Sequence, residues 1–318
     1  MDIVDRVYSV IPIQNIKCDT DLTEFENEQP LDISEVVGRT YGTPDPEVGE
    51  HLKKLNLTTI NPEEIGSYFE GDILKPAVRG RNGMLDEVYR WPDGTVPYEI
   101  RGSFSKNDLN LISSAFNEYH KQTCIRFVPK SNEKDYIVFQ NGNTGCWSSV
   151  GRVGNGAQVI NLQTPGCVVK IGTVLHEIMH ALGFLHEQNR EDRDSYVSVD
   201  WNNVKKAAYN NFERATPQTT TAFGVSYDTG SVLHYSSNAF AIDPSKPTII
   251  PKDPQALKVM GQRENFSAAD VKKIWKMYKC KSPTASGQKT NNNLHALEAI
   301  GGIISNVFKI GDEEELVE

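Results

Sequence analysis

From Trp91 onward, the pattern of apolar and polar positions is that of a packed domain with both strands and helices. Clusters of β-branched and aromatic residues predict four strands, over 95–100, 124–128, 135–140 and 157–162. Two S-x-x-D patterns, Ser105 with Asp108 and Ser267 with Asp270, predict the starts of two helices. Apolar residues spaced by three and four follow each start, and we expect the helix that begins at Ser105 to cover a sheet.

The first 81 residues differ from this domain, because they are rich in Glu, Asp, Pro and Thr and hold only short apolar clusters. This composition is typical of a leader held on another surface, so we expect residues 1–81 to be a pro-segment. The leader ends in Arg79-Gly80-Arg81, which is either a cleavage site for a trypsin-like protease or an ordinary exposed loop. Residues 281–318 are expected to be a polar linker and flexible tail, with helical docking as the alternative.

Composition limits the class of protein. With 38% hydrophobic and 24% charged residues, the chain of 318 can bury a core, which excludes a collagen-like, coiled-coil or wholly disordered protein. It contains no run of 18 apolar residues, so we expect no membrane span. Acidic residues outnumber basic ones by 16 to 8 in the leader and by 6 to 3 in the tail, against 20 to 22 in residues 82–280. The net charge of −9 argues against nucleic acid as the main partner.

Four of the five cysteines lie in residues 82–280 without a C-x-x-C pair, which favours two disulfides and an oxidising compartment. Cys18, in the leader, has no assigned partner. Entry into such a compartment normally requires a signal peptide with a basic start and an unbroken apolar run. The N-terminus instead opens with two acids, and its apolar run is broken by Ser9 and Pro12. We find no signal peptide. The chain begins after one, or its start is misassigned, or the protein leaves the cell by another route.

The run H-E-x-x-H-x-x-G-x-x-H places three of the chain's seven histidines within eleven positions. On an α-helix, His176 and His180 lie about 40° apart in azimuth and about 6 Å apart in rise, so both rings can reach one metal ion. His186 would lie about 15 Å along that helix from His176, too far to share the ion. The chain must therefore turn, and Gly183 can take the left-handed conformation that ends a helix.

Three neutral imidazoles with a fourth position left open are typical of a catalytic rather than a structural zinc site. We therefore predict one Zn²⁺ per chain, bound by His176, His180 and His186. Zinc lowers the pKa of a bound water to about 7, and Glu177 lies beside the ligands, where it can act as general base. Hydrolysis of peptide bonds is the reaction that this arrangement suits.

These residues resemble the astacin family of metzincin zinc endopeptidases, whose signature H-E-x-x-H-x-x-G-F-x-H-E matches residues 176–187. The resemblance covers most of the chain. It implies an α+β, two-lobed metzincin-like domain over 82–280, with a twisted mixed sheet, a zinc-binding helix and a C-terminal helix. Residues 231–235 resemble the family's turn below the zinc, which implies that Tyr235 is a weak zinc ligand that also stabilises the oxyanion. Leu233 replaces the family's methionine, and we expect activity to survive this nearly volume-conserving change, with a weakened zinc site as the alternative.

The resemblance also implies the disulfides and a means of latency. Four cysteines allow three pairings, of which the family pattern is Cys124–Cys280 with Cys146–Cys167. Phe69-Glu70-Gly71-Asp72 resembles the F-x-G-D motif with which astacin pro-segments place an aspartate on the zinc. Asp72 is then a metal ligand in the latent form only, and a plain turn is the alternative.

Activation and substrate binding follow from the same resemblance. Cleavage after Arg81 starts the mature chain at Asn82, whose ammonium group reaches a buried Glu187 through water, unless Glu187 is a surface acid. Residues 157–162 are expected to be an exposed edge strand that pairs an extended peptide antiparallel. Lys252 resembles a basic residue that favours an acidic side chain after the scissile bond, although a solvated lysine is the simpler account.

The predicted function is that of a secreted zinc metalloendopeptidase, made as a latent precursor that a trypsin-like protease activates near Arg81. Its expected partners are protein or peptide substrates and that protease. An alternative is a zinc-binding protein of the same fold with weak or lost turnover, for which Leu233 is the one hint. Glu177, Tyr235 and Asp72 argue against it. A zinc hydrolase of small molecules is a third possibility and requires a covered edge strand.

Overall fold

The computed structural model describes residues 43–56, 60–74, 87–215 and 221–281, all within one compact unit, Gly38–Glu318. Cys18, the predicted cleavage stretch around Arg81 and the tail beyond residue 281 lie outside the described residues. The helices are α2 (Pro46–Leu52), α3 (Lys106–Gln122), α4 (Ile171–Ala181) and α5 (Ala268–Met277). The strands are β1 (Thr95–Ile100), β2 (Arg126–Pro129), β3 (Tyr136–Gln140), β4 (Cys146–Trp147), β5 (Ala157–Leu162), β6 (Val197–Val199) and β7 (Ile249–Pro251).

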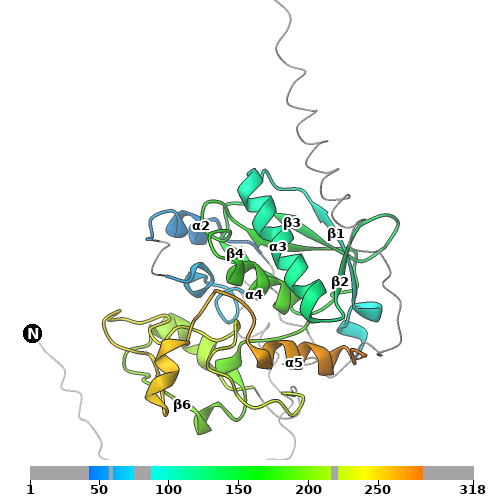
Figure 1. Ribbon diagram of the computed structural model, residues 1–318. Coiled ribbons are helices and arrows are strands. Elements are labelled where there is room, and N and C mark those ends of the chain that lie inside the picture. The colour runs from blue at the N-terminus through cyan, green and yellow to red at the C-terminus, as the bar shows by residue number, and fades with distance from the viewer. Residues whose placement is uncertain (1–42, 57–59, 75–86, 216–220, 282–318) are drawn as a thin grey trace, which may run out of the picture. The chain divides into compact units, whose positions relative to one another are not determined.

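Five strands form one sheet in the order β2-β1-β3-β5-β4. The first four run parallel to their neighbours and β4 pairs antiparallel with β5, so the mixed sheet is confirmed. Helices α3 and α4 lie side by side against it (Figure 1), and the Tyr119 hydroxyl of α3 donates to the Leu175 carbonyl of α4 at 2.9 Å. Buried aromatic rings fill this layer, with Phe116 stacked on Phe127. Dense packing of this kind holds α4 in place.

Predicted elements with strong local signals are confirmed. Ser105 and Ser267 each accept a hydrogen bond from the backbone three residues on, and Asp108 and Asp270 accept one in return, so both helices open with a capping box. Strands β1 and β5 have the predicted bounds. The strand predicted over 124–128 is shifted to Arg126–Pro129, and Cys124, the first residue of the predicted range, forms a disulfide with Cys280 instead.

The second lobe contains the antiparallel pair β6–β7. Helix α5 lies below α3, to one side of the region that holds β6 (Figure 1), and its Trp275 donates to the Gln122 carbonyl at the end of α3. The expected two-lobed α+β architecture is therefore confirmed. Two disulfides have the pairing that the resemblance implies: Cys124–Cys280 and Cys146–Cys167. The first joins the end of α3 to the end of α5, and the second joins β4 to the segment before α4. Both restrict the unfolded chain and so stabilise the fold.

The prediction that β5 is the edge strand is wrong. Its open side is taken by β4, in which Cys146 pairs with Leu162 and Trp147 with Asn161. The edge therefore belongs to β4 and to Ser148 beyond it, and the leader occupies this edge. The Ser148 amide donates to the Asp72 carbonyl at 3.0 Å, and the Leu74 amide donates to the Ser148 carbonyl at 2.9 Å, in a parallel pairing.

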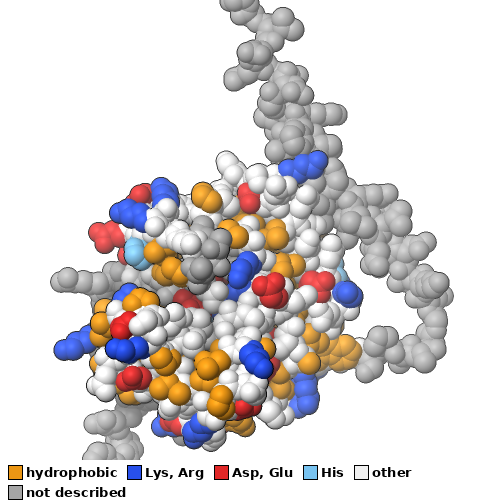
Figure 2. Space-filling model, turned by 60° about the vertical axis from the view of Figure 1, so that its left-hand side comes forward, with side chains coloured by type: hydrophobic (Ala, Val, Ile, Leu, Met, Phe, Trp, Pro, Cys, Tyr) orange, Lys and Arg blue, Asp and Glu red, His pale blue; other side chains and the backbone are white. Residues whose placement is uncertain are grey.

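The surface mixes all types of side chain. On the face shown in Figure 2, basic, acidic and apolar side chains are interspersed. Exposed apolar residues of the second lobe include Trp201, Ile250 and Leu257. Within the described ranges, every helix is too short or too polar to cross a bilayer. The three histidines and the glutamate of the H-E-x-x-H-x-x-G-x-x-H motif lie in the interior.

Candidate metal centre

Helix α4 carries the first two histidines of the motif on a face that is completely buried. The helix ends after Ala181, and Gly183 has φ +113°, a left-handed conformation that glycine adopts without strain. The Gly183 amide donates to the His180 carbonyl at 2.8 Å as the chain leaves the helix. The predicted turn is therefore present, and it brings His186 back toward His176 and His180.

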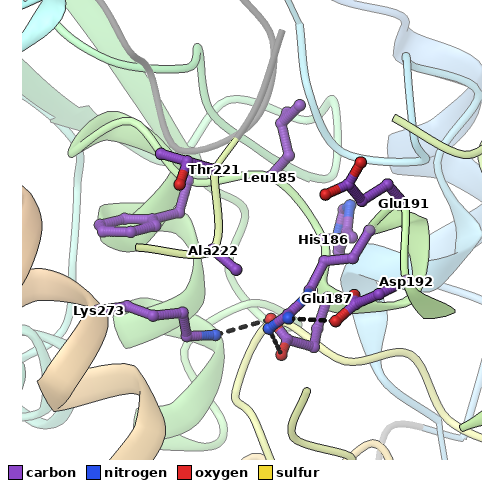
Figure 3. A pocket seen from close by; sticks show the side chains of 10 residues that line it. Leu185, His186, Glu187, Glu191, Asp192, Thr221, Ala222 and Lys273 are labelled. Atoms are coloured by element: carbon purple, nitrogen blue, oxygen red, sulfur yellow. Dashed lines mark hydrogen bonds and ion pairs between the residues drawn. The ribbon is translucent and has the colours of Figure 1, made fainter. Parts of the chain in front are cut away.

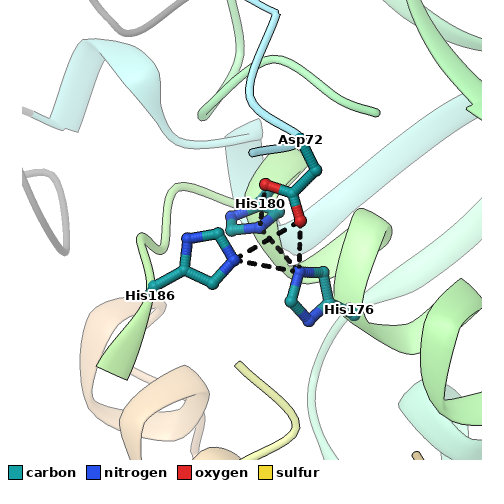
Figure 4. Close-up of side chains that lie close together, drawn as sticks. All are labelled: Asp72, His176, His180 and His186. Carbon is teal, nitrogen blue, oxygen red and sulfur yellow. Dashed lines mark hydrogen bonds and ion pairs between the residues drawn. The ribbon is translucent and has the colours of Figure 1, made fainter. Parts of the chain in front are cut away.

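Four buried side chains converge at this point: Asp72, His176, His180 and His186 (Figure 4). One Asp72 oxygen lies 2.8 Å from His176 Nε2 and 3.4 Å from His186 Nε2, and the other lies 3.5 Å from His180 Nε2. The four ligand atoms all lie within 4.8 Å of one another. The structure thus joins the three motif histidines to the leader aspartate 104 residues before the first of them.

The hydrogen bonds of the rings show that this cluster fits a cation. His176 Nδ1 lies 2.7 Å from the Val232 carbonyl and His180 Nδ1 lies 2.7 Å from the Phe184 carbonyl, so both Nδ1 atoms must donate. In neutral rings the Nε2 atoms are then unprotonated, and they face each other at 3.0 Å beside the Asp72 carboxylate. A cation between them would satisfy these lone pairs, and three nitrogens with one oxygen form a donor set suited to zinc.

Glu177 lies beside the cluster on α4 and is fully buried. Neither carboxyl oxygen has a hydrogen-bond partner within the described part of the chain. Burial, together with the charge of Asp72, raises the pKa of Glu177 well above its usual value. Burial also raises the pKa of Asp72, but His186 and His180 outweigh this effect and lower it well below the usual range. The environment therefore affects the two carboxyl groups in opposite directions: it lowers the pKa of Asp72 and raises that of Glu177.

The loop that contains Leu233 and Tyr235 lies under the histidines. Leu233 is buried, and its carbonyl accepts a hydrogen bond from the Glu187 amide at 3.1 Å. The Tyr235 ring lies 4.6 Å from that of His186, measured between centroids. Its hydroxyl donates to the backbone carbonyl of Glu70 in the leader. The structure therefore places Tyr235 next to the third histidine, with its hydroxyl engaged by the leader.

Two further leader acids, Glu63 and Glu64, are buried in contacts that the sequence did not reveal. Glu63 forms an ion pair with Arg263, and neither side chain is exposed. Glu64 accepts hydrogen bonds from the Ser236 amide at 2.7 Å and from its hydroxyl at 2.5 Å. The Arg263 carbonyl accepts a hydrogen bond from the Gly172 amide, at the start of α4. The leader is thus anchored to the second lobe beside the metal centre as well as on the histidines.

Glu187 is buried, so its interpretation as a surface acid is wrong. Its partners are already present: Lys273 Nζ lies 2.7 Å and Arg190 Nη1 2.9 Å from its oxygens, and the Asp228 amide donates at 2.9 Å. Burial lowers the pKa of Lys273, but Glu187 and Asp270 outweigh it and raise that pKa. Glu187 therefore has cationic partners in this structure without a new N-terminus. A cavity of about 60 Å³ adjoins this ion pair (Figure 3), which is room for a few water molecules.

Comparison with known proteins supports the same chemistry. The model of the Astacin peptidase family matches residues 83–279. The zinc metalloproteinase nas-8 of Steinernema carpocapsae is 40% identical over 250 residues, which are 74% of this chain and 58% of that protein. The zinc metalloproteinase nas-4 of Caenorhabditis elegans is 38% identical, over 74% of this chain and 76% of its own length. Meprin A subunit beta of Rattus norvegicus is 41% identical over 69% of this chain and 30% of its own length.

The chain therefore spans between about a third and three quarters of these relatives. Among solved structures, high choriolytic enzyme 1, a hatching enzyme zinc-protease of Oryzias latipes, is 36% identical with a TM-score of 0.55, covering 60% of this chain and 94% of that one. Zinc is named for both nas proteins and for the hatching enzyme, and the histidine cluster fits this metal. Because the family model covers more than half of the 318 residues and relatives at about 40% identity agree with it, the chain belongs to the astacin family.

Proposed function

We propose that this chain is the latent precursor of a secreted zinc endopeptidase that hydrolyses peptide bonds in proteins. The observation that carries the proposal is the approach of the Asp72 carboxylate, from the leader, to all three motif histidines. The domains follow from it: residues 1–81 are the pro-segment, 82–280 the catalytic domain and 281–318 a linker and tail. The two disulfides favour an oxidising, extracellular location.

His176, His180 and His186 would bind the zinc ion, with Asp72 as the fourth ligand in the precursor. When bound, zinc supplies a Lewis acid that polarises the scissile carbonyl and lowers the pKa of a coordinated water to about 7. Glu177 would act as the general base, since it adjoins His176 and no other group holds its oxygens in the described residues. It would take a proton from the attacking water and deliver it to the leaving amine.

Tyr235 would gain its role when the leader departs. In the precursor its hydroxyl is occupied by the Glu70 carbonyl. Once free, the hydroxyl would be available beside His186, both as a weak zinc ligand in the resting enzyme and as a donor to the oxyanion. Leu233 keeps the buried floor below the rings, which is consistent with retained activity.

Activation would require cleavage near Arg81, by a trypsin-like protease, and release of the leader from the cleft. The cavity beside Glu187 and Lys273 offers a place for the new N-terminus at Asn82 to approach Glu187 through water. Since Lys273 and Arg190 already neutralise Glu187, this contact would adjust the conformation of the domain around Glu187. It would not supply a charge that Glu187 lacks.

A substrate would bind along the edge vacated by the leader, at Ser148 beyond β4, in place of β5. We infer that Arg263, and not Lys252, would receive an acidic substrate side chain. Arg263 faces two leader carboxylates next to the metal centre. Their departure would remove both of these anionic partners, while the guanidinium would keep its hydrogen bonds to the carbonyls of His234 and Gln262. Lys252 is exposed, and its ammonium group donates to the Asp194 carbonyl at 2.5 Å.

The test is a fluorogenic peptide assay on the full chain before and after trypsin treatment. We expect activity only after treatment, its loss with a chelator and its recovery with zinc. Glu177→Ala should bind zinc but show no turnover, and Asp72→Ala should be active without full latency. Zinc binding without turnover in the activated wild-type protein would instead support the alternative of a binding protein with lost activity.

A further inference from the structure

The three motif histidines are not held in the same way. His176 and His180 donate from Nδ1 to the carbonyls of Val232 and Phe184, which belong to the catalytic domain. His186 Nδ1 lies 2.9 Å from a carboxylate oxygen of Glu70, which belongs to the leader. Two rings therefore keep their orienting partner after activation, and the third loses it.

Glu70 is built into the site. Its side chain is buried, and the same oxygen that meets His186 Nδ1 also accepts a hydrogen bond from the His186 amide at 3.3 Å. Its backbone has φ +47°, in the left-handed region that residues other than glycine seldom adopt. This backbone conformation lets Glu70 aim at His186 while Asp72, two residues on, aims at the cluster. Strained conformations that persist in a fold are often tied to function.

On the basis of the proposed zinc role of the histidines, we propose that Glu70 is a positioning residue. It orients His186 for the metal, so that the leader strengthens metal binding through the third histidine independently of the Asp72 ligand. Among the described residues, Glu70 is the one hydrogen-bond partner of His186 Nδ1. After leader removal the site would keep its three nitrogen ligands but hold the metal less firmly.

The physical reason is the effect of the outer partner on the ligand. A carboxylate that accepts from Nδ1 fixes the ring orientation, leaves the Nε2 lone pair free and makes that nitrogen a stronger base. Loss of such a partner typically weakens metal binding by about 10- to 100-fold. The same range is expected for Glu70→Ala in the precursor.

The experiment compares full-length precursors that carry Glu70→Ala, Glu70→Gln, Asp72→Ala and the double substitution of both residues. Zinc affinity is measured by competition with a chromophoric chelator, and the visible spectrum of the cobalt-loaded proteins reports ligand geometry. Glu47→Gln, at an exposed leader acid, is the matched control. Unfolding of the metal-free proteins in urea checks that each variant folds.

We expect Glu70→Ala to weaken zinc binding about 10- to 100-fold in the wild-type background and again in the Asp72→Ala background. Glu70→Gln should restore part of the loss, because an amide oxygen can still accept from Nδ1. An unchanged affinity in the Asp72→Ala background would overturn the proposal, since Glu70 would then act only by holding Asp72 in place. Failure of wild-type precursor to bind zinc would instead refute the proposed function itself.

Discussion

The ion pair between Glu63 and Arg263 predicts how firmly the leader is held. Both side chains have no exposed surface, and they lie 200 residues apart in the sequence. In the docked state, Glu63→Gln would leave the Arg263 guanidinium buried with a weaker partner. When the leader is undocked, the same guanidinium is solvated. The substitution therefore weakens docking of the leader without altering the catalytic domain.

The expected size follows from the contacts. Breaking a buried ion pair by removing one charge costs about 3–5 kcal/mol. Glu64 remains as a second carboxylate, 3.6 Å from Arg263 Nη2, and the new amide can still accept a hydrogen bond, so we take about 3 kcal/mol. This free energy corresponds to roughly a 100-fold change in the docking equilibrium. The fraction of precursor with an open cleft should rise by the same factor.

The assay measures peptide hydrolysis by the uncleaved precursor, in a background where Arg79 and Arg81 are both replaced by Gln to prevent processing. The control is Glu50→Gln, because Glu50 is an exposed leader acid whose side chain is 56% accessible. It pairs with exposed Lys53 and accepts a hydrogen bond from Asn143 at 2.6 Å, which a glutamine oxygen can also accept. When Arg79 and Arg81 are kept, activation removes the leader. Glu63→Gln and Glu50→Gln must then both have the kcat/KM of the activated wild-type enzyme. Residual activity of Glu63→Gln within twofold of the Glu50→Gln control would show that the ion pair does not hold the leader.

Four further predictions concern stability and specificity. Burial lowers the pKa of His120 to about 4, so the folded state resists protonation and stability should fall as pH drops from about 6.5 to about 4; His120→Gln should flatten this part of a urea-unfolding pH profile. Lys273→Met should lower the free energy of unfolding by about 3 kcal/mol. This is the lower end of the range for a broken buried ion pair, because Arg190 still pairs with Glu187. The control, exposed Lys272→Met, should change the free energy of unfolding by less than about 0.5 kcal/mol. Leu233→Met should shift the free energy of unfolding by less than about 1.5 kcal/mol, and a larger change in calorimetry would contradict a volume-conserving site. Cleavage profiling of the activated enzyme should show Asp or Glu enriched beside the scissile bond, and Arg263→Gln should abolish the enrichment.

The sequence predicted those parts of the molecule that local signals determine. The capping boxes at Ser105 and Ser267 mark both helix starts, because each involves residues only three positions apart. The turn at Gly183 follows from the need to bring His186 back, and the structure has it. The approach of Asp72 to the histidines was predicted from the resemblance of its motif, since spacing carries no information across 104 residues.

The remaining parts depend on contacts between distant segments. Nothing in the sequence pairs Glu63 with Arg263 or Glu70 with His186, because a charged residue in a leader is by default solvated. The edge strand was misassigned because β4 has only two residues, too few for a periodic pattern. Lys273 was missed as the partner of Glu187 because its neighbour Lys272 makes the pair look like an ordinary solvated helix face.

The direction of the leader along the edge at Ser148 bears on self-digestion. A substrate bound antiparallel, as a strand-adding protease would hold it, presents each carbonyl and amide to the cleft in one order. The leader runs parallel to the edge at Ser148. The order of its amide and carbonyl groups along the cleft is therefore the reverse of that in an antiparallel substrate. Precursor molecules could then accumulate at high concentration without consuming their own leaders, and the timing of their maturation would be set by a different enzyme.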